Sequence, residues 1–87
     1  MKAVITVVGQ DKPGIIAKVS NVLFKNDINI LDISQTIMQE MFTMIMMVDM
    51  PSKATKAISA ELDVVADEMG LSIRVQNEEV FKSMHRI

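Results

Sequence analysis

The 87-residue sequence contains no cysteine, tryptophan or tyrosine, and only three phenylalanines. The absence of cysteine excludes disulfides, thiolate metal sites and thiol nucleophiles. The scarcity of aromatic side chains argues against an RNA-recognition domain, because such domains stack bases on aromatic rings. With 9 basic and 11 acidic residues the net charge is −2, so the composition lacks the positive charge that nucleic-acid binding requires.

No apolar run approaches the length of about 18 residues that a membrane-spanning helix needs, and no basic segment followed by an apolar stretch indicates a signal peptide. We therefore expect a cytoplasmic protein. The length suits a single domain, residues 1–87, with one core. Hydrophobic residues make up 49% of the chain and nine residues are methionine, which predicts an aliphatic, Met-rich core. A domain so small and apolar is expected to oligomerise.

Hydrophobic periodicity predicts the first half of the fold. Residues 2–8 form a strand that is apolar on both faces, which is typical of a central strand. A helix follows from Pro13 and ends at Asn26 and Asp27, which tolerate left-handed turns. Its predicted apolar stripe comprises Ile15, Ile16, Val19, Val22 and Leu23. Residues 28–39 form a second strand, in which a change of parity near residues 30–32 predicts a β-bulge.

The second half repeats the same order of elements. A short hairpin connection at residues 39–41 leads to a strand over residues 42–50, and Pro51 ends it. A second helix follows, which Gly70 would cap. Its predicted apolar stripe comprises Ala54, Ala57, Ile58, Leu62, Val65, Ala66 and Met69. Residues 71–76 alternate as a half-buried edge strand, and a short terminal helix is expected from Val80, Phe81, Met84 and Ile87.

The β-α-β-β-α-β order predicts an α+β, ferredoxin-like fold, with a four-stranded antiparallel sheet, two helices on one face and a short C-terminal helix. This fold hosts many unrelated activities. Catalysis finds little support, because the sole histidine, His85, is near the end of the chain and the serines lack a base. Both arginines, Arg74 and Arg86, are far from the first loop, where a phosphate-binding enzyme of this fold would need one. We therefore expect that the protein is not an enzyme and that it binds neither a cofactor nor a metal ion.

The connection over residues 9–15 is the strongest candidate site. It joins a strand to a helix N-terminus, whose unpaired backbone N–H groups can hold a carboxylate. Asp11 could hold an ammonium group nearby, so the loop offers what a free amino acid requires. The structural alternatives are that Pro13 and Gly14 only start the helix and that Asp11 only places negative charge at its N-terminus. Likewise Asn29 could support a turn, and Asp32 could face solvent or reach the ligand.

Two segments carry a resemblance to a known family. They are Gly9-x-Asp11-Lys12-Pro13-Gly14-Ile15-x-Ala17 and Asn29-Ile30-Leu31-Asp32-Ile33-Ser34-Gln35, with Phe42-Thr43-Met44 in the next strand. Together with the element order they resemble an ACT domain over nearly the whole chain. More narrowly, the chain is similar to stand-alone small proteins of an uncharacterised ACT family, whose relatives include regulators of the glycine cleavage system repressor type.

The resemblance implies regulation by a small ligand, usually an amino acid, bound between the first loop, the first helix and the second strand, often at a subunit interface. Asp11 and Asn29 occupy the positions of the family's polar ligand contacts, and the backbone of Gly14 and Ile15 would take the carboxylate. Gly9 stands where some relatives carry a polar side chain or histidine, which removes one ligand contact. With no catalytic or DNA-binding domain attached, the regulatory signal would have to pass to a partner protein. Ligand-dependent rearrangement of a dimer would generate that signal.

The predicted third strand is apolar on both faces, although the helices can cover only one. We therefore expect a homodimer interface, formed either sheet on sheet or side by side at the edge of the second strand. The candidate interface residues are Ile33, Met44, Ile45 and Met47, and Met47→Glu is expected to give a monomer if that face is the interface. The alternative to a ligand sensor is a ligand-free homo-oligomeric interaction module.

Overall fold

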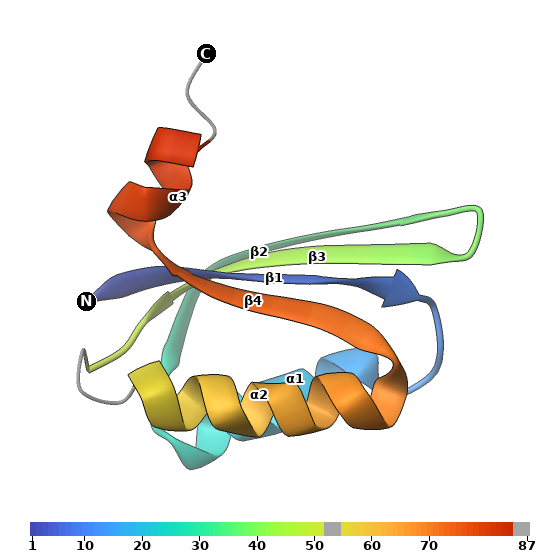
Figure 1. Cartoon of the computed structure of the whole chain (residues 1–87), viewed down its shortest axis with the longest axis horizontal. Helices are drawn as coiled ribbons and strands as arrows, with labels where there is room; N and C mark the ends of the chain where they lie inside the picture. The colour runs from blue at the N-terminus through green and yellow to red at the C-terminus, as the bar shows by residue number, and fades with distance from the viewer. Residues whose placement is uncertain (52–54, 85–87) are drawn as a thin grey trace.

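Four antiparallel strands form one sheet in the order β2-β3-β1-β4, and two helices lie side by side against one of its faces (Figure 1). This computed structural model describes residues 1–51 and 55–84. The elements are β1 (Lys2–Gln10), α1 (Ile15–Lys25), β2 (Asn29–Met38), β3 (Met41–Asp49), α2 (Thr55–Met69), β4 (Leu71–Asn77) and α3 (Glu78–Met84). The ferredoxin-like fold and its short C-terminal helix are therefore confirmed. The predicted positions Ala54, His85, Arg86 and Ile87 lie outside the described residues.

The core lies between the sheet and the pair formed by α1 and α2. Alternate side chains of β3 are buried there, as the period of a strand requires: Phe42, Met44, Met46 and Val48. The helices contribute one stripe each: Ile15, Val19, Val22 and Leu23 from α1, and Ile58, Leu62, Val65 and Met69 from α2. Met44 has 0% of its surface exposed, so its assignment to a dimer interface is wrong. Its face of β3 is the one that the helices cover.

Two residues predicted on buried helical stripes are exposed. Ile16 is 40% exposed because it lies on the flank of α1 that points toward β2, beyond the core. Ala57 is exposed because it is offset from the buried stripe of α2, which begins at Ile58. Each of these residues is the sequence neighbour of a buried residue. The helical period of 3.6 residues predicts the centre of a buried stripe but does not predict which residues at its edge are exposed.

Strand β2 is an edge strand, and all of its residues are exposed. The pairing with β3 shifts register between Ile30 and Asp32, which confirms the predicted bulge. Ile30, Ile33 and Ile37 pair with Val48, Met46 and Phe42, whose side chains are in the core. Since directly paired residues lie on the same face of a sheet, these three isoleucines are on the helix side but beyond the cover of the helices.

The other face of the sheet carries α3, which lies on the side opposite to α1 and α2 (Figure 1). It packs against β1 and β4, and Val4 is buried on this face. Within α3 the Lys82 ammonium is 2.9 Å from the Glu78 carboxylate. This hydrogen bond lowers the pKa of Glu78 and raises the pKa of Lys82. Ile45 and Met47 of β3 lie on the same open face, as the alternation predicted.

Candidate functional site

The loop between β1 and α1 is held by backbone hydrogen bonds at both ends. The N–H of Asp11 donates to the carbonyl of Glu40 at 2.7 Å, and the N–H of Lys18 donates to the carbonyl of Gly14 at 3.0 Å. Gly14 is the N-cap residue of α1, with φ at +91°, and no side chain caps the helix. The first-turn N–H groups of α1 therefore lack a side-chain acceptor, which is the condition for anion binding at a helix N-terminus.

A hollow of about 240 Å³ lies beside this helix N-terminus. It is lined by Asp11, Lys12, Gly14, Ile15, Ile16, Ala17, Gln35, Ile37 and Phe42. The structure thus brings three of the predicted site residues together, and Pro13 lies in the same loop without lining the hollow. Lys12, Gln35 and Ile37 also line the hollow, although they were not among the predicted site residues. Gln35 belongs to the second family segment, and strand parity places it on the same face as Ile37.

Asn29 and Asp32 do not join this hollow within one chain. Strands β1 and β2 are both antiparallel to β3 and so run parallel to each other. Asn29, at the start of β2, therefore lies at the end of the sheet where β1 starts, whereas Asp11 follows the end of β1. Asp32 pairs with Met47 on the open face, and its Oδ1 accepts a hydrogen bond from the N–H of Ile33 at 2.8 Å. Within one chain the structure therefore does not bring Asn29 and Asp32 to this hollow, and their part in the ligand site stays a prediction.

Gly9 is glycine because β4 passes close to it. A Cβ atom at this position would lie 2.5 Å from Cδ2 of Leu71, 3.3 Å from its Cα and 3.4 Å from the carbonyl oxygen of Gly70. Leu71 is part of the core, so its side chain has little room to move away. The absence of a side chain at residue 9 is therefore a requirement of packing at the base of the loop.

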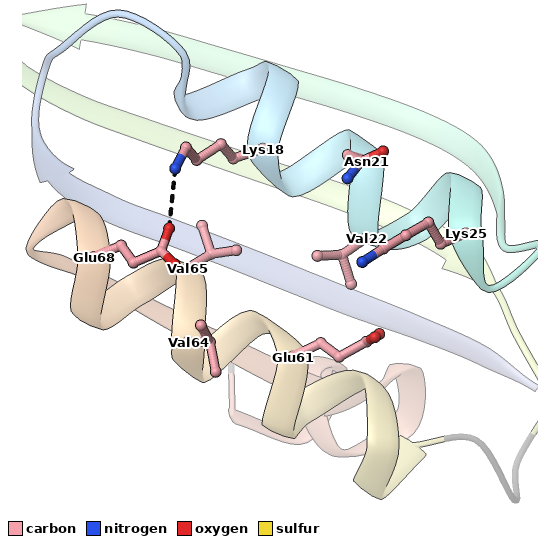
Figure 2. A pocket seen from close by; sticks show the side chains of 8 residues that line it. All are labelled: Lys18, Asn21, Val22, Lys25, Glu61, Val64, Val65 and Glu68. Carbon is pink, nitrogen blue, oxygen red and sulfur yellow. Dashed lines mark hydrogen bonds and ion pairs between the residues drawn. The ribbon is translucent and has the colours of Figure 1, made fainter.

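A second hollow, of about 340 Å³, lies between α1 and α2 (Figure 2). Val22, Val64 and Val65 supply its apolar surface, with lysines from α1 on one side and glutamates from α2 on the other (Figure 2). Lys18 of α1 and Glu68 of α2 form an ion pair across the groove, with the Lys18 Nζ 2.9 Å from the Glu68 Oε2. At the other end of the helix pair, the Asn26 amide donates to Glu61 at 2.6 Å. This groove is a helix-packing seam.

Two negative findings apply to residues 1–51 and 55–84. No group of three or more histidine, cysteine, aspartate or glutamate side chains is arranged to hold a metal ion. Over the same ranges, none of the helices combines the length and hydrophobicity needed to cross a membrane.

Comparison with known proteins identifies the family. The family model of the ACT domain matches residues 2–76, and this chain belongs to that family. A UPF0237 protein of Clostridium acetobutylicum is 53% identical over 89 residues, covering all of both chains. An ACT domain protein from Streptococcus pneumoniae is 37% identical with a TM-score of 0.81, and the match covers 94% of each chain.

The resemblance seen in the sequence is thereby confirmed. A candidate glycine cleavage system transcriptional repressor shares the fold, with a TM-score of 0.79 at 24% identity over 86% of this chain and 44% of the other. ACT domains are regulatory modules that typically bind amino acids.

Proposed function

We propose that this protein is a cytoplasmic, non-enzymatic regulator that binds a small amino acid in the hollow beside the β1–α1 loop. The observation that carries the proposal is that an uncapped helix N-terminus and the carboxylate of Asp11 line one hollow. The ligand carboxylate would accept hydrogen bonds from first-turn N–H groups such as that of Ile15, and the ligand ammonium would pair with Asp11.

The other surfaces of the hollow favour an aliphatic ligand side chain. The apolar lining comes from three elements, with Ile16 on α1, Ile37 on β2 and Phe42 on β3, and only 2% of the Phe42 surface is exposed. Gln35 adds an amide that can donate or accept. A volume of about 240 Å³ is below that of pockets for drug-sized ligands, which supports a small ligand.

A homodimer would complete the site. Exposed apolar side chains occur along α1 and β2, and we call this set the β2 edge surface. It comprises Ile16, Phe24, Ile30, Ile33 and Ile37, of which Phe24 is 79% exposed and Ile33 46%. Isolated exposed apolar residues are ordinary, but a strip along an unpaired strand edge favours association.

The symmetry of such a dimer bears on the predicted role of Asn29. Two copies of β2 related by a two-fold axis run antiparallel, so the start of one strand lies beside the end of the other. Asn29 of the partner subunit would then lie near the hollow that contains Asp11. A ligand contacting both subunits would favour one dimer arrangement by its differential affinity, and a partner protein would respond to that arrangement.

A thermal-shift screen of the full chain against the twenty free amino acids tests the proposal, with calorimetry on any that respond. A ligand that binds only the folded state stabilises it by about 2.7 kcal/mol at a hundred times its dissociation constant. We expect a selective shift for one or a few small aliphatic amino acids. If none of the twenty shifts the midpoint while the protein remains oligomeric, the exposed β2 edge surface supports the alternative, a ligand-free interaction module.

A further inference from the structure

A third hollow, of about 380 Å³, lies on the open face of the sheet, opposite to the amino-acid site. It is lined by Thr6, Val8, Ile45, Ser72, Arg74, Gln76 and Phe81. These residues come from the three strands β1, β3 and β4 and from α3, which stands on the same face (Figure 1). Its volume is within the range of pockets that bind small molecules.

Arg74 is the only cation among the described residues that line this hollow. It pairs across the sheet with Thr6, and Ser72 and Gln76 flank it on its own strand. All three neighbours are neutral, and among residues 1–51 and 55–84 no carboxylate forms an ion pair with Arg74. Asp32 lies on the same face but on β2, three strand spacings or roughly 14 Å across the sheet. The guanidinium therefore has its five donors available for a ligand.

The rest of the lining is apolar. Ile45 follows Thr6 in the same row across the sheet, Val8 occupies the next row, and Phe81 of α3 closes one side. A site with a guanidinium and hydroxyl donors on one side and aliphatic and aromatic surface on the other fits an anion with an apolar body. Inorganic anions would leave the apolar surface unused.

We propose that the open face of the sheet binds a small organic carboxylate, which Arg74 holds through bidentate hydrogen bonds while Val8, Ile45 and Phe81 contact its apolar body. The hydroxyl groups of Thr6 and Ser72 supply further donors. The proposal is independent of the amino-acid site, because the two hollows are on opposite faces of the sheet and share no residue.

Benzoate is a suitable probe, and benzyl alcohol is its uncharged counterpart. In a nitrogen–proton correlation spectrum of the labelled full chain, benzoate should shift amide signals of β1 and β4 around Thr6 and Arg74 in a saturable manner. Benzyl alcohol should bind far more weakly. Arg74→Gln should weaken benzoate binding by about tenfold or more, since a hydrogen bond to a charged group is lost. The control Lys12→Gln removes a cation on the other side of the sheet and should leave this binding unchanged.

Several results would overturn the proposal. Equal binding of benzoate to Arg74→Gln, equal binding of benzyl alcohol, or shifts confined to residues 14–17 would each do so. An absence of amide shifts would overturn the proposal as well. The translational diffusion coefficient would then report whether a second copy of the chain covers the open face. Should Arg74→Gln fail to fold, Arg74→Lys keeps the charge without the planar fork, and its benzoate affinity should fall measurably below that of the unmodified chain.

Discussion

The backbone N–H of Asp11 donates a hydrogen bond to the carbonyl oxygen of Glu40 at 2.7 Å. This bond fixes the loop of the proposed amino-acid site to the turn between β2 and β3. The two turn residues, Gln39 and Glu40, have φ angles of +48° and +71°. Two consecutive positive φ values are typical of a type I′ turn, which normally uses asparagine or glycine. The position of the site therefore depends on a turn built from residues that tolerate it poorly.

Glu40→Gly is expected to stabilise the protein. Glycine adopts positive φ without the steric cost that a Cβ atom imposes, and part of that gain is offset by its greater freedom in the unfolded chain. We expect an increase of about 1 kcal/mol in the free energy of unfolding, or a rise in Tm of about 4–8 °C. Glu40→Ala is the matched control, because it removes the carboxylate and keeps the Cβ atom. Equal stabilisation by both variants would contradict the explanation by φ.

Asp11→Ala is expected to abolish the thermal shift caused by the amino-acid ligand while leaving the fold intact. The side chain of Asp11 is exposed, and the bond that holds the loop comes from its backbone. Stability without ligand should change by less than about 0.5 kcal/mol. Asp63→Ala removes an exposed carboxylate from α2 and should leave ligand binding unchanged. Retention of binding by Asp11→Ala in calorimetry would show that the site is assigned to the wrong loop.

Gly9→Ala is expected to destabilise the protein by about 1–3 kcal/mol, because the new methyl group would overlap Leu71. Chemical denaturation measures the change. In a double-mutant cycle, Gly9→Ala should cost less in the Leu71→Ala background, where Cδ2 is absent. Equal costs in both backgrounds would show that the contact with Leu71 is not the cause.

Ile33→Glu and Met47→Glu distinguish the two dimer arrangements. Ile33 lies on the β2 edge surface and Met47 on the open face, and neither side chain is part of the core. We expect Ile33→Glu to give a monomer, because a charge at the centre of an apolar interface is left without a partner. Met47→Glu should keep the mass of the unmodified protein in light scattering. The reverse result would place the interface on the open face, as a sheet-on-sheet dimer requires.

Much of the fold follows from local patterns in the sequence. The alternation from Phe42 to Val48 predicts a strand whose two faces differ in their environment, and Pro13 with Gly14 predicts where α1 starts. The change of parity near Ile30 predicts the bulge. These features are local because the period of a strand or helix and the φ preference of a residue act over a few neighbours.

Only the tertiary structure decided which apolar residues are buried and which polar residues meet. Met44 and Met47 are alike in the sequence, yet one is in the core and the other is on the open face, because α1 and α2 cover only one side of β3. Asp11 and Asn29 are separated because β1 and β2 run parallel, so their equivalent ends lie together. Burial and proximity depend on how whole elements pack, whereas the sequence pattern determines the elements themselves.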